Sequence, residues 1–369
     1  DGWKEADIDI PVPCVGHKQK EADAPVFTVK GLLYRDLVQV ITEQLKDPET
    51  FKEMYLQPFS EHWKPTGDDT PVRVYGEVYS SDAMLDAQHG LFEKLQDVPR
   101  PRPEAFLVAL MLASDSTFLT QFSQASMWPV YMFFGNTSKY TRCSPSSLST
   151  HHVAYLPKID EQFSDFYVKT YHQVPSPDVL AFVKRELVHR VLRLMFGGKF
   201  SEAHTHGIIT ECADRIARLW FPWLVCHETD YPERSLVATI RFLADFPCPH
   251  CLVLKSQIGN LSSVDDMECR ARVRKYPATS VKRARKRIFE KGGSVNYRGV
   301  EDELTDTGSW VPTENGYYLS LGIEPFELLV VDILHDFEIG VFKMVFTHLI
   351  RILYSVGPEK VQELNRRCV

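Results

Sequence analysis

The sequence predicts an α/β protein in which a mixed sheet is flanked by helices, and three observations lead to this class. Three stretches of strand length follow one another closely, at 106–113, 127–134 and 152–156. A long helix with a regular apolar face begins after them, at Ser176-Pro177-Asp178. A further strand, at 218–225, is again followed by a helix. Strands that alternate with helices in this way are typical of α/β folds.

The first three strands are recognised by their composition and by the turns that end them. Phe106–Ala113 is a continuous apolar run, as expected for a strand covered on both faces, and it ends in Ser-Asp-Ser-Thr. Met127–Phe134 is aromatic and β-branched and ends at Gly135-Asn136, and His152–Leu156 follows. The short connections predict an antiparallel meander.

The two helices that follow are recognised by their first residues. Ser176 is placed as an N-cap with Pro177 at the first helical position, and Gly197-Gly198 ends that helix. The strand Arg218–Val225 leads into Cys226-His-Glu-Thr-Asp230. Pro232 then opens a helix that carries Leu236, Ile240 and Leu243.

Residues 1–103 are predicted to be an N-terminal extension, with a helix near Arg35–Gln44 and a proline-rich linker, Val98-Pro-Arg-Pro-Arg-Pro103. Residues 104–369 form the second unit, the predicted catalytic domain. Within it, about 246–325 is an insertion in which the pattern loosens, and helical periodicity returns at Pro325–Tyr354.

Composition bounds the class of protein. The 369 residues are 44% hydrophobic and 25% charged, which argues against a disordered or collagen-like chain. The longest apolar runs fall short of the roughly 18 residues of a membrane span, so we expect no membrane partner. Eight irregularly spaced cysteines do not indicate a disulfide framework. The chain lacks a Gly-rich nucleotide loop, a Gly-x-Ser-x-Gly elbow and a His-Glu-x-x-His motif.

Asp115 and Asp230 each come after a predicted strand, with two further strands and a helix between them, and an acidic helix follows near the C-terminus. Short carboxylates at strand ends, joined by an acid from a helix, suit Mg²⁺ or Mn²⁺. Two such ions about 4 Å apart activate a nucleophile and stabilise the leaving oxygen of a phosphodiester. The alternative interpretation makes Asp115 and Asp230 turn or N-cap residues, at even odds.

The third acid is taken from the segment 332–340 with a helical wheel. Glu338 falls at the edge of the apolar arc, where an unpaired carboxylate is costly unless it binds metal, so it is preferred. Asp336 is the alternative and Asp332 comes third. The competing interpretation of Asp332 and Asp336 is an ordinary solvated face.

Cys248-Pro-His-Cys251 has the spacing of half a tetrahedral zinc site. His335 is the candidate third ligand, and Cys269 or His250 are further options. The alternative is a pair of reduced cysteines in a turn.

A strongly basic stretch stands out against the net charge of -7, because residues 270–287 include nine Lys or Arg and no acid. It predicts DNA phosphate contacts and nuclear import. Basic runs are also common on solvated helix faces. The candidate DNA-binding residues are Lys282, Arg283, Arg285, Lys286 and Arg287.

Six ordered motifs resemble the Plavaka transposases of basidiomycete fungi, which are CACTA-like, over about Tyr75–Tyr354. They are Asp115-Ser-Thr-Phe-Leu-Thr-Gln-Phe-Ser, Trp128-Pro-Val-Tyr-Met-Phe-Phe-Gly-Asn136, Ala154-Tyr-Leu-Pro157, Asp230-Tyr-Pro-Glu-Arg234, Cys248-Pro-His-Cys251 and Asp332-Ile-Leu-His-Asp-Phe-Glu-Ile-Gly340.

The resemblance implies a ribonuclease H-like mixed sheet with an insertion before the last catalytic helix, and a DDE triad of Asp115, Asp230 and Glu338. The family often has Glu where this chain has Asp336, so that assignment stays open. The implied function is two-metal cleavage and strand transfer on transposon DNA by a nuclear enzyme, with a homo-oligomer as a further expectation. Members usually continue well beyond Tyr354, so a truncated, inactive remnant that binds nucleic acid or protein is the alternative.

Overall fold

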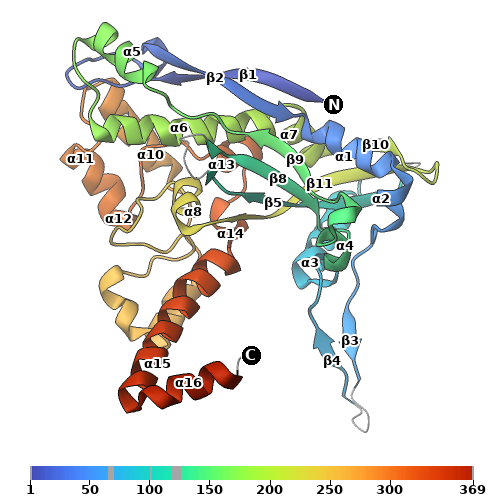
Figure 1. The fold of residues 1–369 in the computed structure, drawn as a ribbon. Helices are drawn as coiled ribbons and strands as arrows, with labels where there is room; N and C mark the ends of the chain where they lie inside the picture. The colour runs from blue at the N-terminus through green and yellow to red at the C-terminus, as the bar shows by residue number, and fades with distance from the viewer. Residues whose placement is uncertain (1, 65–69, 100–101, 119–125, 368–369) are drawn as a thin grey trace.

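The computed structural model describes residues 2–64, 70–99, 102–118 and 126–367. Its main feature is one eight-stranded sheet (Figure 1). Along the sheet the strands are β1 (Trp3–Pro11), β2 (Val26–Arg35), β9 (His151–Tyr155), β8 (Pro129–Phe134), β5 (Ala105–Ser114), β11 (Ala217–Thr229) and β10 (Ile208–Glu211), and β12 (Leu329–Val331) also pairs with β11. Residues 119–123 of the first transposase-like motif and 100–101 of the predicted linker lie outside the described residues.

The strand directions make this a mixed sheet. β5, β11 and β12 are parallel neighbours, whereas β8 runs antiparallel to β5 and β9 antiparallel to β8. The predicted meander of β5, β8 and β9 is therefore confirmed, and so is the α/β class. A mixed sheet of this order, flanked by helices, is consistent with a ribonuclease H-like fold.

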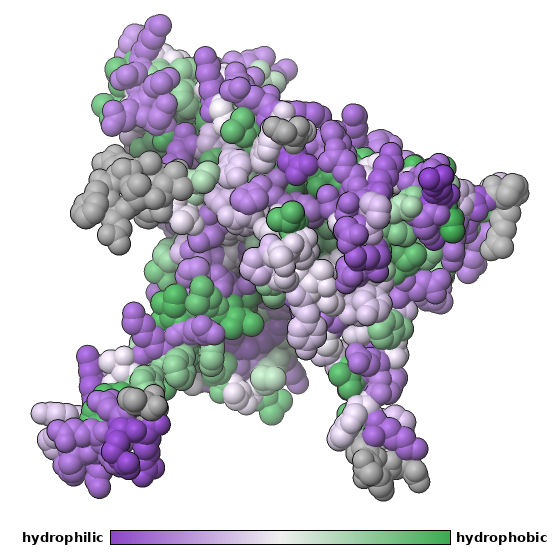
Figure 2. All heavy atoms as spheres, turned by 45° about the vertical axis from the view of Figure 1, so that its right-hand side comes forward, coloured by the Kyte–Doolittle hydropathy of each residue, from purple (hydrophilic) through white to green (hydrophobic). Residues whose placement is uncertain are grey.

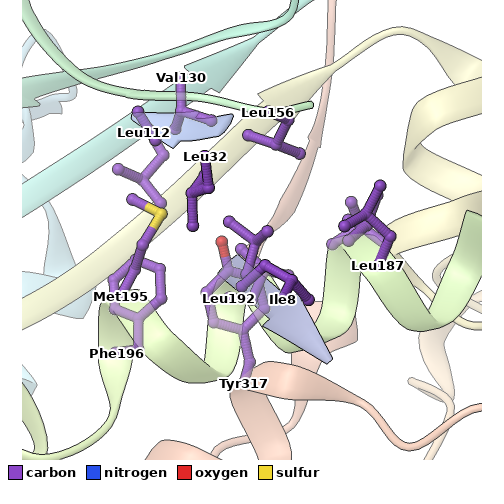
Figure 3. Packing of buried hydrophobic residues seen from close by; sticks show 14 of the residues in the cluster. Ile8, Leu32, Leu112, Val130, Leu156, Leu187, Leu192, Met195, Phe196 and Tyr317 are labelled. Carbon is purple, nitrogen blue, oxygen red and sulfur yellow. The ribbon is translucent and has the colours of Figure 1, made fainter. Parts of the chain in front are cut away.

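One face of the sheet is covered by α6 (Pro177–Phe196), which begins as predicted, with the Ser176 hydroxyl accepting the backbone N–H of Val179 at 3.3 Å. Leucine, methionine and phenylalanine side chains of α6 pack against the strands, with Tyr317 from α13 (Gly316–Leu321) beside them (Figure 3). This layer is the main hydrophobic core.

The opposite face is covered in part by α3 (Asp82–Lys94), which begins after the Ser81 N-cap. Its apolar residues form a second cluster with Leu107 of β5 and Phe221 of β11. Both faces of β5 are therefore packed, as its continuous apolar run predicts.

The N-terminal region is part of the same sheet, because β2 pairs with β9 and β1 with β2. The predicted helix near Arg35–Gln44 is α1 (Leu37–Lys46), which Asp36 caps. The remaining short elements around the sheet are α2 (Pro48–Lys52), α4 (Lys139–Arg142), α5 (Gln162–Tyr171), α7 (Lys199–His206), and the two-stranded pairs β3 (Glu61–Trp63) with β4 (Val72–Val74) and β6 (Thr117–Phe118) with β7 (Ser126–Met127).

The helix opened by Pro232 is shorter than predicted. α8 spans Tyr231–Val237, and the chain turns at Thr239, whose φ is 54°. Ile240 then forms an isolated bridge with Trp310 and does not continue the helix. The insertion that follows is mostly helical: α9 (Val264–Ala271), α10 (Ala278–Phe289), α11 (Arg298–Val300), α12 (Asp306–Gly308) and α13 (Gly316–Leu321), with the irregular helices η4 (Lys255–Asn260) and η5 (Glu301–Thr305).

The expected helical periodicity over Pro325–Tyr354 is interrupted. After α14 (Pro325–Leu328), Leu329–Val331 forms β12 against β11, because a β-branched pair suits a strand edge. The chain continues as the π-helix η6 (Ile333–Phe342), then α15 (Lys343–Val356) and α16 (Pro358–Arg367), which project from the body (Figure 1).

The projecting helix Ile333–Val356 is apolar, and most of its residues are exposed. Figure 2 shows hydrophobic side chains along this arm and a hydrophilic tip. Within the described chain, it is the one helix whose 24 residues have the length and composition of a membrane span, and none of it is buried. The expectation of no membrane contact rested on uninterrupted apolar runs, which this helix lacks because Asp336, Glu338 and Lys343 interrupt them.

Candidate catalytic site

The candidate site lies where parallel strands β5 and β11 end. The register pairs His227 with Leu112 and Glu228 with Ala113. Continued by two residues, it places Asp230 opposite Asp115. Because neighbouring strands lie about 4.8 Å apart, we expect the two aspartates to lie near each other at this end of the sheet. In agreement, the charges of both aspartates raise the pKa of Glu233 and of His335. The strand-end positions expected for the first two acids are therefore present.

A third aspartate stands at the same level. β12 runs parallel to β11 on its other side, and the register pairs Thr229 with Val331. Its continuation by one residue places Asp332 opposite Asp230. The carboxyl ends of β5, β11 and β12 therefore each carry an aspartate, in a row that crosses three strands.

Each of these aspartates also has a local partner. Asp230 caps α8, with its Oδ1 accepting the backbone N–H of Glu233 at 2.9 Å. The Asp115 Oδ2 accepts from the Thr117 hydroxyl at 3.3 Å. N-capping, the alternative interpretation, is thus correct for Asp230, but a cap uses one carboxylate oxygen and leaves the other for a different partner.

Asp332 is turned towards the helix that it begins. Its Oδ1 accepts the backbone N–H groups of Leu334 and His335, and its Oδ2 contacts the His335 ring. The contact with Asp332 raises the pKa of His335, and the charges of Asp115 and Asp230 raise it further. The first turn of η6 therefore lies near both strand-end acids.

The other two candidate acids are placed differently from each other. Asp336 forms an ion pair with Arg234 of α8, at 2.5 Å. Glu338 is exposed, and none of residues 333–342 is buried. The wheel that favoured Glu338 assumed an α-helix whose apolar arc faces the core. That premise is wrong for this structure, because η6 has the wider π-helical turn and its apolar side chains face outward. Glu338 as the third acid stays a prediction.

Asp115 and Asp230 offer carboxylate oxygens, which are the ligands that Mg²⁺ prefers, but these two side chains do not complete a metal site. Within the described ranges, no three His, Cys, Asp or Glu side chains are placed to hold one metal ion. Asp115 and Asp230 are the pair that the sheet brings together. Among the described residues no third ligand is brought to them, so the residues fit a divalent ion only in part.

Behind this edge lies a buried polar chain that the sequence analysis did not find. Ser114 contacts Glu233 and, at 2.8 Å, the Nε2 of His227, whose Nδ1 lies 2.9 Å from the Tyr317 hydroxyl. Burial lowers the pKa of His227 to about 4. Burial also raises the pKa of Glu233 to about 7, with the charges of Asp230 and Asp115 acting in the same direction.

Cys248 and Cys251 lie in one tight turn, as their spacing suggests. The Cys248 Sγ accepts the backbone N–H groups of His250 and Cys251, each at 3.4 Å. A hydrogen bond from the Cys251 thiol, helped by those two backbone N–H groups, lowers the pKa of Cys248 to about 5. The proposed additional ligands point elsewhere, since the His250 ring contacts the Phe326 carbonyl and His335 contacts Asp332. In the part of the chain that is described, the turn supplies two zinc ligands and no third.

Fewer side chains of the basic stretch are exposed than its sequence indicates. Arg285 is buried in the core, where Glu186 and Glu21 bind its guanidinium. Arg283 and Arg287 both pair with Glu303. The prediction that Arg285 contacts DNA is therefore wrong, because its partners shield the guanidinium from solvent. The exposed members on α10 are Lys282, Arg283 and Lys286.

No curated protein matches this chain. The family model described as Plavaka transposase matches residues 2–351, nearly the whole chain. Membership of that family implies DNA binding and transposase-type DNA cleavage. The chain belongs to the Plavaka transposase family.

Proposed function

We propose that this chain cleaves and joins transposon DNA with divalent metal ions, held by Asp115, Asp230 and an acid from the segment 332–338. The observation that supports this most is the strand register, whose continuation puts Asp115 opposite Asp230 beyond the carboxyl ends of two parallel strands. Open edges of this kind are where α/β sheets bind ligands. Glu338 remains the preferred third acid, with Asp336 as the alternative.

The protein groups have separate tasks in this proposal. When bound, Mg²⁺ or Mn²⁺ would polarise the phosphodiester and activate water. Asp115 and Asp230 supply carboxylate oxygens from rigid strand ends, and the α8 cap fixes one oxygen of Asp230. Asp336 is held by Arg234, which anchors the first turns of η6 to the start of α8. This contact keeps the acidic segment beside the two aspartates.

A second function, an inactive remnant that binds nucleic acid or protein, is favoured by one observation. The described residues do not assemble a third metal ligand at Asp115 and Asp230. The basic insertion proposed to carry such binding has its central arginine, Arg285, buried in ion pairs. Exposed Lys282 and Lys286 would then carry the phosphate contacts. Nuclear localisation is part of both proposals.

The two functions are separated by cleavage of duplex DNA by the purified chain, with Mg²⁺ or Mn²⁺ added. We expect metal-dependent cleavage by the parent chain. Asp115→Asn and Asp230→Asn should each lower it at least 100-fold, because an amide replaces an ionised metal ligand. Asp165→Asn, an exposed aspartate on α5, is the matched control and should cleave like the parent. Equal cleavage by all four chains would refute the metal-site assignment.

Zinc at Cys248 and Cys251 also remains a prediction. The measurement is the zinc content, by mass spectrometry, of protein purified without chelator, compared with Cys248→Ser. A stoichiometric ion that is lost in the variant is the expected result. Absence of zinc from the parent chain would leave the turn as a pair of reduced cysteines.

A further inference from the structure

Four side chains from four separate elements form a continuous buried chain behind the candidate site. Ser114 ends β5, His227 is on β11, Glu233 is on α8 and Tyr317 is on α13. None is more than 9% exposed. Buried polar chains of this kind are costly unless every donor has an acceptor. The directions of their hydrogen bonds can therefore be worked out.

The starting point is Tyr317, which is fully buried and keeps its proton because burial raises its pKa well above the ordinary value. Its hydroxyl has one acceptor among the described residues, the Nδ1 of His227 at 2.9 Å. His227 is neutral, since burial lowers its pKa to about 4, so one ring nitrogen carries a proton. With Nδ1 accepting from Tyr317, that proton is on Nε2.

The rest of the chain follows from this tautomer. The Nε2–H of His227 donates to the Ser114 oxygen, at 2.8 Å. The Ser114 proton is then directed to its other neighbour, the Oε1 of Glu233. If His227 carried its proton on Nδ1 instead, the Tyr317 hydroxyl would lose its acceptor, at a cost of about 1–3 kcal/mol. All three donors therefore point towards the Glu233 carboxyl group.

Glu233 thereby contacts both strand ends of the candidate site. Its side chain holds Ser114, the residue before Asp115. Its backbone N–H holds the Oδ1 of Asp230 at 2.9 Å. One residue thus links the end of β5 to the end of β11, from a position that does not itself require contact with substrate.

We propose that Glu233 is a positioning residue that keeps Asp115 and Asp230 at one level, with Ser114, His227 and Tyr317 orienting its carboxyl group. The inference rests on the proposed function, because the level of the two aspartates matters through the metal ion that they would share. Groups that orient metal ligands typically change metal affinity 10- to 100-fold when they are removed.

The test uses the full purified chain and two readouts. The first is Mn²⁺ affinity, measured by electron paramagnetic resonance. Glu233→Ala should weaken it at least ~10-fold, whereas Glu233→Gln should stay within ~3-fold, because the amide oxygen still accepts from Ser114. Ser114→Ala, which removes one hydroxyl group, should behave like Glu233→Ala. It replaces Glu233→Ala in the test if Glu233→Ala does not fold. The control is Glu186→Gln, another buried glutamate, which should leave Mn²⁺ affinity unchanged.

The second readout needs no metal. Amide hydrogen exchange at 113–116 and 228–231 should be faster in Glu233→Ala and Ser114→Ala, and unchanged in Glu233→Gln. A parent chain that binds no Mn²⁺ would refute the proposed function, while the exchange data would still decide the role of Glu233. Equal losses in Glu233→Ala and Glu233→Gln would overturn the inference, since charge and not the hydrogen bond would then matter. Parent-like exchange in Ser114→Ala would also overturn it.

Discussion

Buried His189 gives the sharpest prediction of how stability depends on pH. The residue lies on α6, 1% exposed, and its two ring nitrogens have different partners. The Nε2 lies 3.1 Å from the Leu236 carbonyl, and the Nδ1 accepts the backbone N–H of Gly316 at 3.1 Å. A neutral ring satisfies both contacts, since one nitrogen donates and the other accepts. Protonation would break the contact with Gly316.

The magnitude follows from the lowered pKa. Burial takes the pKa of His189 from 6.5 to about 4, despite opposing contributions from the Leu236 carbonyl and Glu186. This stabilising effect is fully present above pH 6.5, and it is lost as the pH falls towards 4, because the unfolded chain takes up the proton first. The difference corresponds to about 3 kcal/mol of unfolding free energy.

The assay is urea unfolding at pH 7 and pH 4.5, followed by circular dichroism. His189→Gln should be less stable than the parent at pH 7 but should lose about 2 kcal/mol less between the two pH values. His206→Gln, an exposed histidine on α7, is the control and should lose as much as the parent. If His189→Gln showed the same pH-dependent loss as the parent, the assignment of a buried neutral ring would be refuted.

Two further predictions test buried contacts, and a third tests the DNA surface. Glu186→Ala should destabilise the fold by about 3–5 kcal/mol in urea unfolding, because it removes the buried partner of Arg285, and a Glu186→Met, Arg285→Met double variant should recover much of that loss. Asn136→Ala should cost about 2–4 kcal/mol in the same assay, since its buried amide holds the Ala109 N–H at 2.7 Å and two carbonyl groups; a loss below 1 kcal/mol would contradict those contacts. Replacing Lys282 and Lys286 by Ala should weaken DNA binding and reduce its salt dependence by a slope of about 2, measured by fluorescence anisotropy, and an unchanged slope would exclude α10 from the DNA surface.

The fold was largely predictable because local signals and tertiary contacts agree in its central part. Ser176 and Asp230 both cap the helices that follow them, as their residue types suggest. The apolar run of β5 is buried on both faces, which its composition requires. At Leu329–Val331 the prediction of a helix was wrong, because pairing with β11 decides the structure of a three-residue apolar segment.

The site was predictable only where it depends on strand ends. Asp115 and Asp230 follow strands that the sequence reveals, whereas Ser114 and His227 are 113 residues apart and meet only through the sheet. No pattern in a single sequence signals such a pair. Glu233 has a local signal, since it follows the Asp230 cap by three residues, but that spacing equally suits an ordinary capping box.

In the basic stretch, the sequence instead led to a role for a residue that the structure buries. The run of Lys and Arg was interpreted as a patch of DNA phosphate contacts, which requires each side chain to be exposed, and Arg285 was included for that reason. Here α10 is amphipathic, so Arg285 falls on its buried side with Ala284 and Ile288. Two glutamates from distant parts of the chain, Glu21 and Glu186, compensate its charge. Those partners cannot be identified before the fold is known.

The most direct test of the metal site is a crystal structure of the chain soaked in Mn²⁺, with anomalous scattering recorded to locate the ion. We expect a peak within about 2.5 Å of carboxylate oxygens from both Asp115 and Asp230, with a third acid from 332–338 drawn towards it. Mn²⁺ bound only elsewhere, with these two carboxylates free of metal in a fully soaked crystal, would contradict the account.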